Sequence, residues 1–288
     1  MEKSAKLGKL TLLNIILFGF IGQVAWAVEN NFFNTFLFSF GGTTKDISTM
    51  VAASAVVAVV TTFVMGTLSD KLGRRKVFIC AGYVAWGITV MAFAFISREN
   101  LGKLIGADPS SAAALSATVT TVIVMDCIMT FMGSTSNDSA FNAWITDVTV
   151  PSNRAKTEGL LAILPVLALV IVTGVFGFIA GDDAQASDYA TCFLGLGILV
   201  IICGLVGIFT IKDTGSGQKS DGNFFADLIY GFRPSVIKSH KCLYLSLACM
   251  GVYSIASQVF FPYIFIYIQH YLKSVSYTHL TLPTSDLV

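Results

Sequence analysis

Charged residues are scarce in this sequence. They make up 12% of its 288 residues, against 55% hydrophobic residues, whereas soluble domains devote about a quarter of their residues to charge. The mean hydropathy, +0.75, is correspondingly high. The composition therefore excludes an ordinary soluble domain and predicts a membrane protein in contact with a lipid bilayer. The formal net charge of +1 gives no reason to expect nucleic acid as a partner.

Residues that carry catalysis or hold metals are also few. The three histidines, His240, His270 and His279, stand apart from one another, and the six cysteines show no CxxC spacing. Neither an HExxH nor a GxSxG motif occurs. We therefore expect no catalytic residues, no metal site and no cofactor, and we interpret the cysteines as small packing residues.

Long apolar runs, by contrast, fill most of the chain. Seven runs are each long enough to cross a bilayer, which takes about 20 helical residues. Because none shows the strict alternation of a barrel strand, the sequence predicts an all-α polytopic membrane protein. The first run is too long for a removable signal peptide, and Pro165 is expected to bend the fifth. The runs are residues 12–38, 49–68, 77–97, 114–141, 158–180, 190–211 and 243–271.

Lys and Arg gather at alternate connections between these runs. If the amino terminus is cytoplasmic, all but four of the 18 basic residues fall on the inner side, the exceptions being Lys45, Arg98, Lys103 and Lys273. The positive-inside rule thus predicts a multi-pass protein of the cell membrane with a cytoplasmic amino terminus. This orientation disfavours a seven-helix receptor or a retinal protein. Residues 243–271 also contain no Lys for a retinal Schiff base.

The connection between the second and third runs carries an ordered motif. The stretch "GTLSDKLGRR" places Gly66, Asp70, Gly73, Arg74 and Arg75 in the order GxxxDKxGRR. Any short cytoplasmic turn is basic, but here each position has a physical use. The first glycine allows helices to approach closely, the second can adopt positive φ, and the aspartate can pair with a guanidinium. The stretch resembles the signature loop of the major facilitator superfamily.

The connection after the fourth run supports this resemblance. The stretch "DVTVPSNR" places Asp147, Pro151 and Arg154 in an arrangement similar to the matching turn of that superfamily, especially in its sugar-transporting branches. The first run, with "GQVAWAVENNFFN", also resembles the glycoside, pentoside and hexuronide symporters and the sucrose transporters. The resemblance implies alternating access, with gating roles for both connections.

The resemblance also implies how the chain is divided. Residues 1–211 would form an amino-terminal six-helix bundle, and residues 242–272 the seventh helix, which begins a second half. Residues 212–241 would be a cytoplasmic loop with an interfacial helix near 224–232. Since family members have twelve spans, we expect an inactive fragment of a protein that is monomeric when complete. Residues 273–288 continue no helix and are interpreted as a non-native tail.

Ionisable side chains within the apolar runs are candidates for function, because they are costly in a bilayer. They are Glu29 in the first run, and Asp126 and Asp138 in the fourth. Asp126 is expected near mid-membrane and Asp138 close to the cytoplasmic edge. One of the three could carry a proton across, although each could instead serve as an interhelical hydrogen-bond partner.

Polar stripes accompany these carboxylates. In the fourth run the stripe is predicted to comprise Asp126, Thr130, Ser134 and Asn137, with Asp138 beside it. In the first run Gln23, Asn30 and Asn34 share a face, with Trp26 and Glu29 on its flank. Amides and an indole suit a neutral sugar. We therefore expect substrate to bind Gln23, Trp26, Asn30, Asn34 and Asp126.

The sequence thus favours a secondary active transporter that moves a small polar solute, most simply a sugar or glycoside, together with a proton. Sodium is the less favoured ion, because the melibiose-type sodium symporters have aspartates in both their first and second spans and the second run here offers only hydroxyl groups. Two alternatives remain open. One is an exporter or facilitator of a non-sugar solute in the same superfamily, and the other is a channel lined by the polar stripe.

Overall fold

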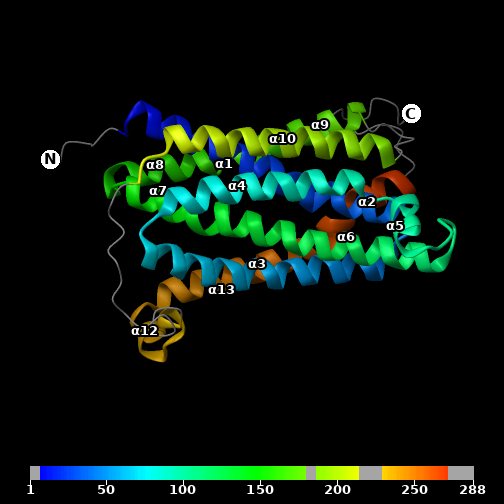
Figure 1. Ribbon diagram of the computed structural model, residues 1–288. Coiled ribbons are helices and arrows are strands. Elements are labelled where there is room, and N and C mark those ends of the chain that lie inside the picture. The colour runs from blue at the N-terminus through cyan, green and yellow to red at the C-terminus, as the bar shows by residue number, and fades with distance from the viewer. Residues whose placement is uncertain (1–6, 180–185, 214–228, 272–288) are drawn as a thin grey trace, which may run out of the picture.

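The computed structural model describes residues 7–179, 186–213 and 229–271, which are almost entirely helical. Within these ranges, seven helices are long and apolar enough to span a membrane. They lie side by side, and their connections gather at the two ends of the bundle (Figure 1). The predicted all-α polytopic fold with seven spans is confirmed.

Spans one and two are longer than the apolar runs that predicted them, and span three begins and ends two residues before its run. Span one comprises α1 (Lys9–Val28), a π-helical segment (Glu29–Phe33) and α2 (Asn34–Ser39). Span two is α3 (Thr44–Leu72), and span three is α4 (Arg75–Ala92) with a 3-10 turn (Phe93–Phe95).

The remaining spans include several interrupted helices. Span four comprises α6 (Ala112–Gly133), a π-helical segment (Ser134–Phe141) and α7 (Asn142–Val148). Span five comprises α8 (Pro151–Leu161) and α9 (Leu164–Ile179), and span six is α10 (Ala186–Thr210). Span seven is α13 (Lys241–Phe260), followed by a 3-10 turn (Phe261–Tyr263), α14 (Ile264–Ile266) and a π-helical segment (Tyr267–Tyr271). Two shorter helices, α5 (Arg98–Ile105) and α12 (Pro234–Ser239), lie between spans.

Polar caps extend the helices beyond their apolar runs. At the start of α3, Thr43 Oγ1 accepts a hydrogen bond from Asp46 N at 3.3 Å, and Asp46 Oδ2 accepts one from Thr43 N at 2.8 Å. The helix ends at Gly73, whose φ of +61° confirms the predicted positive φ. The helix α5 was not predicted from the sequence, although Ser97 caps it and Gly106 ends it at φ +68°.

Span five is interrupted where Pro165 follows a helical turn. The α-helix breaks at residues 162–163, because proline has no N–H to donate to the carbonyl of Leu161. This interruption agrees with the bend expected from the sequence. It separates the polar α8 from the apolar α9.

Two glycines bring spans three and six into close contact. A Cβ added to Gly197 would lie 2.6 Å from the carbonyl oxygen of Gly87, and one added to Gly87 would lie 2.5 Å from that of Gly197. Backbone thus packs on backbone, as is typical of membrane helices with small residues at their contact. In Figure 1, α4 and α10 accordingly run together along most of their length.

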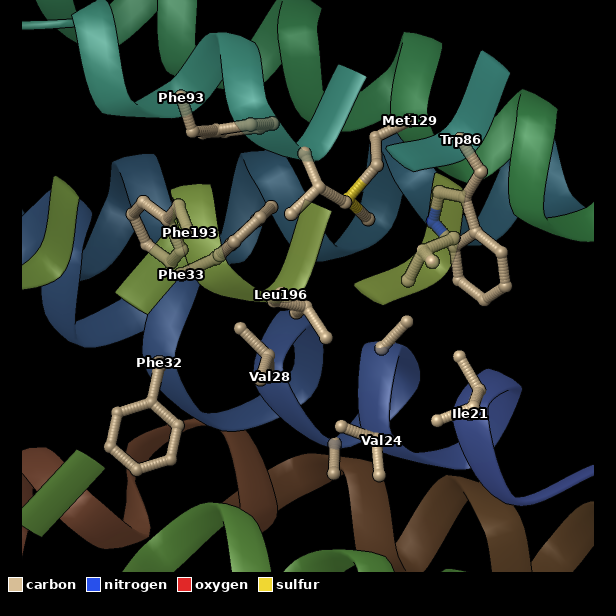
Figure 2. Packing of buried hydrophobic residues seen from close by; sticks show 14 of the residues in the cluster. Ile21, Val24, Val28, Phe32, Phe33, Trp86, Phe93, Met129, Phe193 and Leu196 are labelled. Carbon is tan, nitrogen blue, oxygen red and sulfur yellow. The ribbon is translucent and has the colours of Figure 1, made fainter. Parts of the chain in front are cut away.

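An aromatic cluster joins the same two helices to span one. The ring of Phe33, in the π-helical segment of span one, lies with its centroid 4.1 Å from that of Phe93 and 5.0 Å from that of Phe193 (Figure 2). All three rings are buried. Near the other end of span one, Asn14 Nδ2 donates a hydrogen bond to Thr210 O at 3.0 Å. Spans one, three and six therefore form the closely packed side of the bundle.

Span seven packs more loosely. None of the residues of α13 is buried, but beyond it the hydroxyl oxygens of Tyr263 and Ser48 approach to 2.5 Å. The predicted interfacial helix near 224–232 falls mostly outside the described residues, and its described end forms a 3-10 turn (Tyr230–Phe232). The tail at 273–288 also lies outside the described residues.

Candidate functional site

A polar cavity of about 490 Å³ lies between spans one, two, four and seven. Every residue predicted to bind substrate or couple protons lines it. The expected substrate ligands are Gln23, Trp26, Asn30, Asn34 and Asp126, and the other two carboxylates are Glu29 and Asp138. The structure therefore brings together residues that are up to 115 positions apart in the sequence, from Gln23 to Asp138.

The three carboxylates face the cavity without a basic partner. None of the residues that line it within the described chain is a Lys, Arg or His. Thr130 Oγ1 donates to Glu29 Oε1 at 2.9 Å, which links span four to span one. Ser134 Oγ donates to Asp138 Oδ2, also at 2.9 Å. Hydroxyl groups of span four thus donate to both Glu29 and Asp138.

Two buried carboxylate oxygens are left without a hydrogen bond among the described residues. They are Glu29 Oε2 and Asp126 Oδ1. Asp126 is only 2% exposed, and the Ser54 hydroxyl interacts with its carboxylate but leaves Oδ1 without a partner. A buried polar atom without a partner is costly unless something else satisfies it. A transported ion or solute could do so. Among the described residues, no group of three or more His, Cys, Asp or Glu is placed to hold a metal ion.

A π-helical segment turns Asp138 into this cavity. In a regular α-helix each residue rotates by about 100°, so Asp126 and Asp138 would face different directions. The π-helical segment Ser134–Phe141 has more residues per turn, and this shift brings both aspartates to one side. Asp138 therefore lines the cavity, and the span continues beyond it to Val148.

The same shift makes the prediction for Asn137 wrong. Asn137 was expected in the stripe with Asp126, but it points away from the cavity and is 4% exposed. Its Oδ1 lies 3.1 Å from the hydroxyl of Tyr83, which also donates to Phe18 O at 2.7 Å. Asn137 is thus a buried contact between spans one, three and four. The regular helical period used for the prediction does not hold through a π-helical segment.

The other walls of the cavity are mostly apolar. Span two contributes Ser54 and a row of apolar side chains that includes Ala55 and Ala58. Span seven contributes Gln258 and Pro262. These two spans therefore complete the lining of the cavity.

A second, neutral cavity of about 310 Å³ lies behind span one, against spans five and seven. It shares Gln23, Trp26, Asn30 and Gln258 with the first cavity. Asn31 lines it as well, and sequence reasoning missed this residue because it lies off the predicted stripe. The sequence feature that could have identified Asn31 was its amide side chain within an apolar run.

At the inner end expected from the charge pattern, Arg75 joins two motif aspartates. Its guanidinium forms ion pairs with Asp70, at the end of span two, and with Asp147, at the end of span four, the latter with Nε to Oδ2 at 3.2 Å. Its Nη1 donates to Ser69 Oγ at 2.6 Å. The Arg75 side chain is 10% exposed. This arrangement fits the expected pairing of Asp70 with a guanidinium, and it connects the two motifs.

The other motif residues, Arg154, Arg74 and Gly66, take no part in the ion pairs of Arg75. Arg154 Nη2 donates to Thr146 O at 2.9 Å and so caps the last turn of α7, whereas Arg74 is exposed. The close approach expected at Gly66 is not found, because an added Cβ would meet the nearest atom, Ser139 Cβ, at an ordinary 3.8 Å.

We predict that Arg75→Gln destabilises the fold through the Asp147 carboxylate that it leaves unpaired. Breaking a fully buried pair costs about 3–5 kcal/mol. Asp147 is 20% exposed and Asp70 is 54% exposed, so we expect the free energy of unfolding to fall by about 1–3 kcal/mol. Chemical unfolding in detergent would measure this change in the free energy of unfolding.

The exposed neighbour provides the control for this experiment. Arg74→Gln should change the free energy of unfolding by less than about 0.5 kcal/mol. Adding Asp147→Asn to Arg75→Gln should restore part of the loss, because it removes the unpaired charge. Equal effects of the two single arginine substitutions would contradict the structural role of Arg75.

Comparison with known proteins agrees with the motifs and the fold. No curated protein and no solved structure matched the chain significantly. A family profile, that of the Major Facilitator Superfamily, matches residues 15–283. This match covers well over half of the chain and includes the described cavity and both motifs. The chain therefore belongs to the Major Facilitator Superfamily, a family of membrane transporters.

Proposed function

We propose that this chain carries the substrate and proton sites of a secondary active transporter for a small neutral sugar or glycoside, with proton symport by alternating access. The observation that carries the proposal is the composition of the 490 Å³ cavity. Amides, one indole and three carboxylates line it, without a base among the described residues. An anionic solute would be repelled there, whereas neutral polyols and cations would be accepted.

The amide and indole groups provide the recognition. Gln23 and Asn30 can each donate and accept hydrogen bonds, as sugar hydroxyls require. The indole of Trp26 lies beside them in the wall of the cavity, and its face can pack on the apolar face of a sugar ring. We infer that this wall orients the solute.

The carboxylates supply the coupling. Glu29 accepts a hydrogen bond from Thr130 of span four, and Asp126 interacts with the Ser54 hydroxyl of span two, so protonation of either carboxylate changes an interaction between spans. A proton taken up at this position from one side and released to the other would drive transport. Asp138 is a third acceptor, within reach of the same cavity.

Alternating access would use the Arg75 cluster as its inner closure. Arg75, Asp70 and Asp147 tie the ends of spans two and four together, and breaking these ion pairs would release them. The basic connections support an amino terminus on the cytoplasmic side of the cell membrane. In this orientation the cluster faces the cytoplasm.

An organic cation is the second candidate solute. Carboxylates with unpaired oxygens, such as Glu29 Oε2 and Asp126 Oδ1, would also bind a protonated amine. A transporter for such a cation would exchange it for protons. The amide wall favours the neutral polyol, because an amine alone has no use for several amide groups.

The test is uptake of radiolabelled glucose, galactose, xylose and sucrose by transport-deficient cells that express the complete gene, with and without a protonophore. We expect saturable uptake of at least one sugar, and its loss when the protonophore collapses the gradient. Uptake that survives the protonophore would refute proton symport. Uptake of labelled tetraethylammonium, with none of the sugars, would replace the sugar by an organic cation.

A further inference from the structure

The two cavities differ in charge although they share a wall. The larger cavity contains Glu29, Asp126 and Asp138, whereas none of the described residues that line the smaller one carries a charge. The smaller cavity is also lined by Pro165 and Leu169 of span five and by Phe261 of span seven. It therefore offers a mixed apolar and amide surface, which is the usual character of a small-molecule site.

One buried group in the smaller cavity lacks a hydrogen bond. Asn31 is 3% exposed, and its Nδ2 donates to Ala27 O at 2.7 Å. Its Oδ1 has no partner among the described residues. The backbone hydrogen bond fixes the amide in one orientation, so the carbonyl oxygen remains available as an acceptor.

We propose that the smaller cavity is the subsite for the neutral solute and that Asn31 Oδ1 accepts a hydrogen bond from one of its hydroxyl groups. The proposal rests on the sugar and proton function above and divides that function between two chambers. The larger cavity, here called the acidic chamber, holds the proton, and the smaller cavity, the neutral chamber, holds the sugar. The sequence expectation that Asp126 contacts substrate is replaced by a coupling role alone.

The shared wall explains how the chambers communicate. Gln23, Trp26, Asn30 and Gln258 line both cavities. A side chain that turns toward bound sugar withdraws from the acidic chamber, and the reverse also holds. Binding in one chamber therefore changes the surroundings of the carboxylates in the other, which is the physical requirement for coupling.

The size of the neutral chamber limits its ligand. Small-molecule sites range from about 300 to 1,000 Å³, and this chamber, at about 310 Å³, lies at the lower end. A single sugar ring fits such a volume, with any second ring placed in the shared opening. We therefore expect monosaccharides or the terminal ring of a glycoside to be recognised.

The test separates binding from transport in the complete protein, purified and placed in nanodiscs. Equilibrium binding of radiolabelled glucose, galactose, xylose and sucrose is measured for the wild type, Asn31→Leu and Asp126→Asn. We expect Asn31→Leu to weaken binding of the best sugar by about ten-fold or more, because it removes a buried acceptor of similar size. Asp126→Asn should change the affinity by less than about two-fold, since its chamber does not hold the sugar.

Asn142→Leu is the matched control. Asn142 donates to the carbonyl of Asp138, four residues earlier, at 3.0 Å, as Asn31 does to Ala27, but it lines neither cavity. It should leave affinity unchanged. A circular dichroism melt verifies that each variant is folded, and Asn31→Ser provides a smaller polar substitution if the leucine variant does not fold.

The outcomes are distinguishable from those of the proposed function. Equal weakening by Asn31→Leu and Asp126→Asn would overturn the two chambers in favour of one shared site, and so would an Asn31 variant with normal affinity. Absence of binding for every sugar would also overturn the proposal. The predicted binding pattern without proton-dependent uptake would uphold the neutral subsite and reject proton symport.

Discussion

Under the proposed function, Asp126→Asn is expected to reduce proton-driven sugar accumulation by about 100-fold, near the upper end of typical coupling effects. The substitution preserves shape but removes the group that gains and loses a proton. Asp126 is 2% exposed and has an oxygen without a hydrogen bond among the described residues. No basic residue lines the described cavity, so no neighbouring cation there offsets the change.

The measurement compares accumulation with sugar exchange at equilibrium. Exchange should continue in Asp126→Asn, since it needs solute binding and movement of the bundle but no net proton transfer. Loss of both activities in a folded protein would place Asp126 in solute binding instead. Normal accumulation would exclude it from coupling.

Asp108→Asn is the control for this experiment. Asp108 is exposed in the connection between α5 and α6, and hydrogen bonds from the hydroxyl and the backbone N–H of Ser110 hold the pKa of its carboxyl below the usual value. It therefore remains ionised at the pH of transport and cannot carry protons there. We expect accumulation by Asp108→Asn to match that of the wild type.

The second large effect is expected from Gly197→Ala. The added Cβ would lie 2.6 Å from the backbone oxygen of Gly87 and 2.2 Å from Cγ of Met91, closer than atoms in contact can approach. Spans three and six would have to separate, because a backbone atom cannot move aside by changing rotamer. Such overpacking costs about 1–3 kcal/mol, and unfolding in mixed detergent micelles would measure the change.

Gly195→Ala provides a control two residues away. A Cβ at Gly195 would meet no atom within 4 Å among the described residues, and alanine is the better helix former. Its free energy of unfolding should match or exceed that of the wild type. Equal destabilisation by both substitutions would show that the contact between spans three and six is looser than the structure indicates.

The spans and most of the cavity could be predicted from the sequence because they rest on strong physical constraints. A helix of about 20 apolar residues has few alternatives in a bilayer. A carboxylate within such a helix must face protein or water, so Glu29 and Asp126 could be placed together before the fold was known. The charged motif likewise identified Asp70 and Arg75, which the structure pairs.

The remainder depends on local geometry that a regular period does not contain. Asn137 and Asp138 exchange roles because a π-helical segment rotates span four. Asn31 was missed because its importance comes from a cavity formed with spans five and seven. The loose contact at Gly66 and the tight one at Gly197 are equally invisible in sequence, since both depend on how far apart the helix axes lie.

The π-helical segments of spans one and four also contain more residues than α-helical segments with the same number of turns would. A π turn holds about one residue more than an α turn. If the neighbouring turn takes up this extra residue, the π turn shifts along the helix. Each step would rotate the intervening side chains by about 100° while both ends of the span stay fixed. Glu29 begins one segment and Asp138 lies within the other. A carboxylate could thus change its surroundings before the bundle rocks, which would separate proton release from solute release in time.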